Sequence, residues 1–165
     1  MVGATGPAAR LFSFNNMTET GRQPLPHERP LWLSTNHAYF ITTCVTPRGE
    51  NHLAKSEIAE ALIESFAWRH ENSRWHGLIF LIMPDHVHFV AVESPDHSLT
   101  KEIHDWKKYT GRTLGISWQR DFFEHRLRHD ESRSEKYEYI LNNPVRAGLV
   151  EKSDDWAFRW SPLQK

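Results

Sequence analysis

The stretch Gly77–Val92, GLIFLIMPDHVHFVAV, consists of two apolar runs separated by a Met-Pro-Asp corner, with His86 and His88 just beyond the corner. Pro84 has no N–H to donate to a sheet and Asp85 favours turns, so the corner predicts a β-hairpin. Successive side chains on a strand point to opposite faces, so the two histidines share one face, roughly 7 Å apart along the backbone. Two imidazoles placed in this way can bind one divalent cation.

The alternative is a pair of core histidines whose ring nitrogens are satisfied by hydrogen bonds. The chain has 11 histidines in 165 residues, so a chance His-x-His is not rare. The surrounding run is apolar, however, and an imidazole buried there needs a partner. This context favours a functional pair.

The rest of the chain supplies further strands and helices around the hairpin. Residues 1–30 are rich in Gly, Pro, Asn and Thr, and we expect an extended or poorly ordered tail before a single domain spanning 31–165. Apolar periodicity and turn signals predict strands at 37–46, 75–82, 86–93 and 122–128, and helices at 52–72 and 98–115, with a third from a capping box at Ser132. This β-α-β-β-α-β order is typical of an α+β, ferredoxin-like antiparallel sheet with helices mainly on one face, here with an added C-terminal helix.

Composition excludes several classes of function. Cys44 is the only cysteine, so neither an internal disulfide nor a cysteine-rich zinc site can form. The formal net charge of −1 provides no overall attraction to nucleic acid, so a nucleic-acid site must be a local patch. The sequence shows neither a membrane-spanning run nor a signal peptide, and we expect a cytoplasmic protein.

The predicted second helix carries a candidate reacting group, Tyr109. It lies at the border of the helix's apolar face, with Asp105 one turn before it and Arg112 one turn after it. A phenol has an ordinary pKa near 10 and needs a cation or a base to act as a nucleophile. The alternative is a half-buried tyrosine whose ring packs on the core and whose hydroxyl lies in water.

Four segments together resemble a known family. The strings LIMPDHVHFVAV, KKYTGRTLG, WQRDFFEHRLR and YEYILNNPVRAGLVEKSDDWAFRW resemble, in order and spacing, the single-tyrosine HUH transposases. Within that family they are most similar to the REP-associated tyrosine transposases. The resemblance runs from about His37 to Trp160.

The resemblance implies a nuclease that cleaves and rejoins single-stranded DNA beside hairpins through a 5′-phosphotyrosine intermediate. His86 and His88 would hold Mg²⁺ or Mn²⁺ against the scissile phosphate, and Tyr109 would be the nucleophile. The family usually has a third ligand, Asn, Gln or Asp, one helical turn after the tyrosine, whereas this position is Thr113 here. A hydroxyl is a weak ligand for a hard cation, so Asp105 or Glu93, or water and phosphate, would have to complete the shell.

DNA contacts are expected from basic residues near Tyr109 and on the fourth strand. The candidates are Lys107, Lys108, Arg112, Arg126 and Arg128. The segment Asn142–Arg146 is interpreted as a helix end, although Arg146 could also reach DNA. We expect a monomer, with a homodimer as the alternative.

Two other functions remain open at this stage. One is a domesticated hairpin-binding module with little or no cleavage, and the other is a metal-dependent hydrolase of small substrates that would tolerate Tyr109→Phe. The catalytic hypothesis requires the Tyr109 hydroxyl and the two histidines to converge on one pocket. A Tyr109 on the opposite face of the sheet would contradict it, unless the helix moves.

Overall fold

The computed structural model describes residues 37–127 and 130–162, without the side chains of residues 130–132. The tail predicted for residues 1–30 and the candidate Arg128 lie outside the described residues. The described elements are β1 (Ala38–Cys44), α1 (Ser56–Glu71), β2 (Trp75–Ile82), β3 (His86–Glu93), α2 (Leu99–Leu114), β4 (Phe123–Leu127), α3 (Asp130–Leu141), α4 (Asn143–Arg146), the 3-10 helix η2 (Ser153–Asp155) and β5 (Arg159–Trp160).

The strands form one five-stranded antiparallel sheet in the order β4-β1-β3-β2-β5. The four predicted strands have the arrangement expected of a ferredoxin-like sheet, and the predicted α+β fold is confirmed. The additional strand, β5, pairs Trp160 with Phe80 and Arg159 with Leu81. Two residues are too few to show an alternating pattern, so the sequence did not predict this strand.

The central hairpin has the predicted bounds, 75–82 and 86–93. At its corner the Met83 N–H donates to the carbonyl of His86 over 2.8 Å. The carbonyl of Pro84 accepts from the N–H groups of His52 and Leu53, each over 2.9 Å, so the loop before α1 is tied to the corner. The histidines therefore begin β3 from a well-supported turn.

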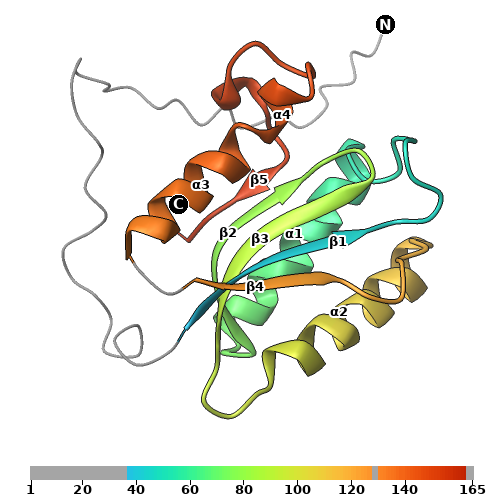
Figure 1. Ribbon diagram of the computed structural model, residues 1–165. Helices are drawn as coiled ribbons and strands as arrows, with labels where there is room; N and C mark the ends of the chain where they lie inside the picture. Colours follow the sequence, from blue (N-terminus) through green and yellow to red (C-terminus); the bar gives the residue numbers. More distant parts are fainter. Residues whose placement is uncertain (1–36, 128–129, 163–165) are drawn as a thin grey trace, which may run out of the picture.

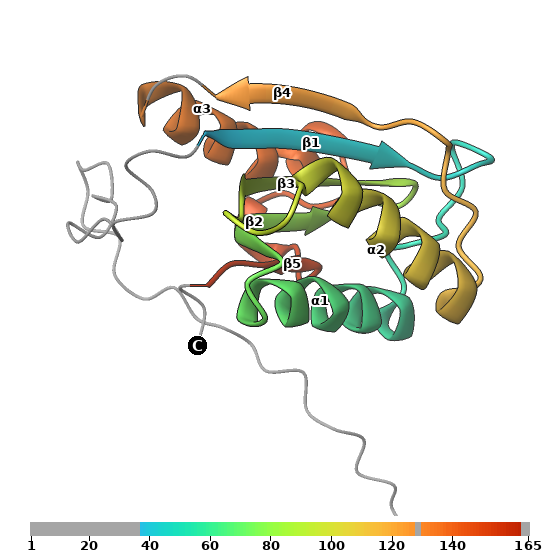
Figure 2. The same ribbon diagram turned by 90° about the horizontal axis from the view of Figure 1, so that it is seen from below.

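The sheet separates two hydrophobic clusters. Side chains such as Val87, Phe89 and Ala91 of β3 pack against α1 and α2, whereas Val90 and Val92 belong to the cluster on the α3 side. Figures 1 and 2 show α1 and α2 on one side of the sheet and α3 on the other. Because side chains alternate along β3, the face that carries the histidines is the α3 face.

Helix ends differ in how closely they follow the sequence. Helix α2 begins after Ser98, whose side chain accepts from the Lys101 N–H, and it ends at Leu114, followed by the C-cap Gly115 with φ of 69°. Both boundaries agree with the prediction. Helix α3 begins at Asp130, two residues before the predicted cap at Ser132, so the predicted start is wrong. Strand β4 ends at Leu127, three residues before α3 begins.

Among the described residues, no helix is both long and apolar enough to span a membrane.

Candidate active site

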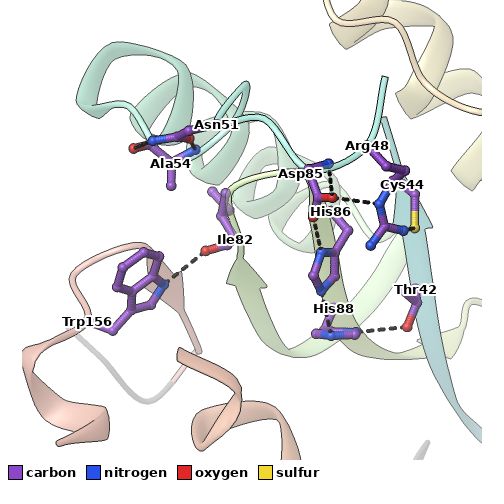
Figure 3. A network of polar contacts seen from close by, with 11 residues as sticks. Thr42, Cys44, Arg48, Asn51, Ala54, Ile82, Asp85, His86, His88 and Trp156 are labelled. Carbon is purple, nitrogen blue, oxygen red and sulfur yellow. Dashed lines mark hydrogen bonds and ion pairs between the residues drawn. The ribbon is translucent and has the colours of Figure 1, made fainter. Parts of the chain in front are cut away.

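His86 and His88 face each other at the start of β3 (Figure 3), with their Nε2 atoms 3.1 Å apart. The His86 side chain is 17% exposed, and His88 is 5% exposed. The sequence-based expectation that the two imidazoles share one sheet face is met.

Each imidazole is oriented through its second nitrogen. The His86 Nδ1 lies 2.6 Å from a carboxylate oxygen of Asp85, and the His88 Nδ1 lies 2.8 Å from the hydroxyl of Thr42. A carboxylate can only accept, so the His86 Nδ1 is the donor in this contact, and in the neutral ring the Nε2 is then the nitrogen with the lone pair. The Thr42 hydroxyl can donate or accept, so it supports either tautomer of His88.

Asp85 links the histidines to the loop that follows β1. Its second carboxylate oxygen accepts from the Arg48 Nε over 2.6 Å and from the Gly49 N–H over 2.8 Å. Burial opposes ionisation, but the hydrogen bonds from His86, Gly49 and Arg48 outweigh it and lower the pKa of Asp85 to about 2. The residue is therefore a carboxylate at neutral pH and holds the His86 ring in place.

His88 is neutral because of its surroundings. Its ring stacks on Phe40 with centroids 5.5 Å apart. Burial, followed by the proximity of His86, lowers the pKa of His88 to about 3. A neutral imidazole keeps the lone pair that a metal ligand needs.

Helix α3 places Tyr139 beside this pair. Its ring centroid lies 6.2 Å from that of His88 and 6.1 Å from that of Phe40, and the residue is 38% exposed. The Arg146 guanidinium lies 5.0 Å and the Lys136 ammonium 5.3 Å from the Tyr139 ring centroid. A tyrosine, two cationic groups and two histidines therefore meet on one face of the sheet.

The neighbouring tyrosine of α3 is structural. The Tyr137 hydroxyl donates to the carbonyl of Leu78 on β2, and burial raises its pKa. Asn143 stands one helical turn after Tyr139, and its Nδ2 donates to the Tyr139 carbonyl over 2.8 Å. Because the amide nitrogen is used in this bond, the Asn143 Oδ1 is the atom that could accept or coordinate.

Tyr109 does not converge with the histidines, contrary to the sequence-based expectation. It lies on α2, which packs on the opposite face of the sheet, and it is 51% exposed. Its ring lies 5.5 Å from the Arg69 guanidinium of α1, in a groove of about 710 Å³ between α1 and α2. The prediction assumed that the helix following the histidine strand covers the histidine face, whereas that helix covers Val87 and Phe89.

The additional ligands proposed beside Tyr109 are also on the α2 side. The Thr113 hydroxyl donates to the carbonyl of Tyr109 over 2.9 Å, and Asp105 pairs with Lys101 over 2.5 Å. Glu93 accepts from the Leu99 N–H at the start of α2. None of these contacts involves His86 or His88.

Four of the five predicted DNA contacts can be located. Lys107 is buried, and its Nζ donates to the carbonyls of Arg120 and Asp121. Lys108 and Arg112 are exposed on α2. Arg126 contacts His37 and precedes Leu127 of the α3-side cluster, so it projects to the α2 side. The structure brings none of the four to the histidine pair.

The sequence reasoning missed Tyr139, which it did not single out on the third helix, and Asn143, which it interpreted as part of a helix end. A signal was available, because Asn143 stands four residues after Tyr139 and is one of the residue types that the family usually has one turn after its tyrosine. Thr113 departs from that pattern at the corresponding place after Tyr109.

Comparisons with known proteins agree with the fold. A protein of Haemophilus influenzae assigned to the REP-associated tyrosine transposases is 28% identical over 138 residues, covering 73% of this chain and 77% of that protein. A REP-associated tyrosine transposase of Escherichia coli K12 is 28% identical over 82 residues, covering 48% of this chain and 50% of that protein. The solved structure of a REP-associated tyrosine transposase bound to a REP hairpin has a TM-score of 0.66 at 22% identity, covering 87% of this chain and 82% of that one.

The family described as "Transposase IS200 like" matches residues 34–142, which include the histidine pair, Tyr139 and most of the sheet. Since this match spans well over half of the chain, the protein belongs to the family of IS200-like transposases.

Proposed function

We propose that this protein cleaves and rejoins single-stranded DNA beside hairpins, with Tyr139 as the nucleophile and His86 and His88 as ligands of a divalent cation. The observation that carries the proposal is the position of Tyr139, whose ring lies 6.2 Å from that of His88 on the same face of the sheet. The proposal keeps the chemistry predicted from the sequence but assigns the role of nucleophile to Tyr139 instead of Tyr109.

The spacing of the third ligand supports the replacement. Counting one helical turn from Tyr139 leads to Asn143, an amide, whereas the same count from Tyr109 leads to a threonine. Asn143 is held next to Tyr139 by its hydrogen bond to the Tyr139 carbonyl. We therefore assign His86, His88 and Asn143 as the protein ligands.

The histidine pair fits a divalent cation. Two ligands at right angles around a cation, each about 2.1 Å away, are separated by about 3 Å, which matches the 3.1 Å between the Nε2 atoms. Among the described residues, no group of three or more His, Cys, Asp or Glu side chains forms a metal cluster. An amide oxygen, water and phosphate would then complete the shell, a set suited to Mn²⁺ or Mg²⁺.

The arrangement supports a reversible transesterification. The Tyr139 oxygen attacks phosphorus and gives up its proton while the bond to the 3′-oxygen breaks, so that a 5′-phosphotyrosine forms and the 3′-oxygen takes up a proton, with no net change in protons. A bound cation would act as a Lewis acid on the phosphate. Lys136 and Arg146 place positive charge beside the Tyr139 ring, where a phosphate must lie to be attacked.

The substrate class follows from the relatives. The structurally similar transposase is bound to a REP hairpin, and the match in fold covers 87% of the present chain. We therefore propose a DNA hairpin with a single-stranded flank as the ligand of this protein. The alternative is a hairpin-binding module that does not cut.

The deciding experiment compares two tyrosine variants in the same assay. Labelled hairpin oligonucleotides with single-stranded flanks are incubated with Mn²⁺ and wild type, Tyr139→Phe or Tyr109→Phe, and then run on a denaturing gel. We expect a covalent protein–DNA band with wild type and Tyr109→Phe and no band with Tyr139→Phe, because phenylalanine lacks only the attacking oxygen.

Loss of the band in Tyr109→Phe with its retention in Tyr139→Phe would refute the assignment. If wild type binds a panel of hairpins but forms no adduct with Mn²⁺ or with Mg²⁺, the result would favour the binding module.

A further inference from the structure

Phe123 is an exposed aromatic residue on the edge of the sheet. It begins the edge strand β4 and is 57% exposed, more than any other large hydrophobic side chain in the described part of the chain. Its neighbours Glu124, His125 and Arg126 are exposed and polar, as expected on an edge strand. A phenylalanine is not needed at this place for the core, because most of its ring remains in water.

The strand register places Phe123 on the proposed catalytic face. Thr42 pairs with His88 on one side and with Phe123 on the other, so the three residues form a row across β3, β1 and β4. Residues in such a row project to the same face. With neighbouring strands about 4.8 Å apart, the backbone of Phe123 lies about 10 Å from that of His88.

Phe40 connects Phe123 to the other members of the site. Its ring stacks on His88 at 5.5 Å and makes edge contacts with Phe123 at 6.2 Å and with Tyr139 at 6.1 Å. The Lys136 ammonium lies 5.0 Å from the centroid of the Phe40 ring. Lys136, a cation that could bind a phosphate, therefore lies beside the proposed nucleophile, and the exposed Phe123 ring lies on the other side of Phe40.

We propose that Phe123 is a stacking platform for one unpaired base of the DNA strand next to the phosphate that Tyr139 attacks. This inference rests on the proposed function and adds a subsite to it. Proteins that bind single strands combine cationic groups for the backbone with aromatic rings on which bases stack, and such stacking tolerates any base. Phe123 therefore contributes affinity and positions the strand, without selecting its sequence.

One exposed ring suits a base better than a protein partner. A stable protein interface buries about 800 Å² on each side, whereas Phe123 is flanked by exposed polar residues along β4. The face is also continuous with the site where, under the proposed function, single-stranded DNA must lie.

The test measures binding without cleavage. Full-length protein carrying Tyr139→Phe is combined with Phe123→Ala, Phe123→Leu or Phe123→Trp, and the affinity for a labelled hairpin with a single-stranded flank is measured by fluorescence anisotropy. We expect binding to weaken by about five-fold or more in Phe123→Ala, to weaken similarly in Phe123→Leu, which lacks a planar ring, and to be retained in Phe123→Trp.

The matched control is Trp68→Ala, since Trp68 is 51% exposed but belongs to α1 on the other side of the sheet. We expect no change in affinity for this variant. Thermal unfolding of each variant shows whether it is folded as wild type.

Abasic nucleotides separate stacking from a structural effect. The DNA is made with one base removed at each flank position in turn. We expect one flank position at which removal of the base weakens DNA binding by Tyr139→Phe protein. With DNA that lacks this base, the Tyr139→Phe/Phe123→Ala protein should bind as tightly as Tyr139→Phe protein. An unchanged affinity of Phe123→Ala, or an equal loss for every abasic substrate, would overturn the stacking proposal.

The two proposals can fail separately. If Tyr139 forms no adduct but one flank position depends on Phe123, the stacking site stands and the nucleophile assignment fails. If the adduct forms and Phe123→Ala binds DNA as its parent does, the nucleophile assignment stands and the stacking proposal is wrong.

Discussion

Asp85 shows how one side chain can organise the candidate site. A single carboxylate accepts from the His86 ring, the Arg48 guanidinium and the Gly49 N–H, which joins the β2–β3 corner to the loop after β1 (Figure 3). Metal-binding histidines commonly donate their second ring nitrogen to such a carboxylate, which sets the tautomer and the ring orientation. The Met-Pro-Asp corner thus contributes a positioning group as well as a turn.

Replacement of Asp85 by asparagine should weaken metal binding. We expect the affinity for Mn²⁺ to fall about 10- to 100-fold, because a neutral amide can turn its NH₂ group toward the imidazole and no longer fixes the His86 tautomer. Isothermal titration calorimetry with Mn²⁺ measures the effect. Asp105→Asn is the control, since Asp105 is exposed on α2 and pairs with Lys101. Equal affinities of Asp85→Asn and wild type would contradict this role.

The two exposed tyrosines illustrate why residue type alone does not identify a nucleophile. Tyr109 and Tyr139 both lie on helices, both are partly exposed, and both have a cation within 5.5 Å of the ring. The histidine pair distinguishes them, because only the Tyr139 ring contacts one of its members. The face of the sheet on which each tyrosine lies therefore distinguishes the proposed nucleophile from the other tyrosine.

At the scale of elements, the packing of α1 on β2 depends on a glycine. A Cβ at Gly77 would lie 2.5 Å from the Phe66 Cε1 atom and 3.0 Å from the Trp160 Cζ3 atom. Phe66 cannot easily move aside, because it is fully buried and stacks on Phe80 with centroids 4.4 Å apart. The glycine allows α1 and β5 to pack closely on the same part of β2.

Gly77→Ala should therefore destabilise the fold. We expect the free energy of unfolding to fall by about 1–3 kcal/mol, the usual cost of overpacking a core. Urea denaturation measures it. The double variant Phe66→Leu/Gly77→Ala provides the control, because a smaller side chain at 66 makes room for the new methyl group. The alanine should then cost less in the Phe66→Leu background than in wild type, and equal costs would disprove the clash.

For the whole molecule, one buried and two partly buried histidines couple stability to pH. Burial lowers the pKa of His70 on α1 and of His76 on β2, and it lowers the pKa of His88 to about 3. In each case the folded-state pKa lies below the unfolded value of about 6.5, so protons bind more strongly to the unfolded chain. The stabilisation is complete above about pH 6.5 and is lost as the pH falls from there toward the folded-state values.

We therefore expect the free energy of unfolding, measured by urea denaturation with a chelator present, to decrease between pH 7.5 and pH 5.5. Each histidine contributes at most about 1.4 kcal/mol per pH unit. His70→Phe should reduce the slope, since it removes one titrating ring while filling the space against Trp160. A stability independent of pH in this range, or an unchanged slope in His70→Phe, would contradict the account.

Local patterns in the sequence determined most of the fold. The hairpin, the ferredoxin-like sheet and the α2 boundaries were predicted correctly. They depend on neighbouring residues: the proline and aspartate at the corner, the alternation along β3 and the apolar stripe of α2. The His86–His88 pair was also predictable, because a two-residue spacing on a strand is enough to place two side chains on one face.

Only the tertiary structure decided which helix faces the histidines. Sequence order favours α2, which follows β3 directly, but the side of the sheet that a helix covers depends on how its apolar face packs against distant strands. Trp106 and Ile103 of α2 join Phe89 on one side, and Ile140 of α3 joins Val90 on the other. This packing brings Tyr139, 51 residues after His88, beside it. The same packing leaves Tyr109 on the opposite side of the sheet. The sequence could not predict this, because contacts between distant segments are not encoded in any local pattern.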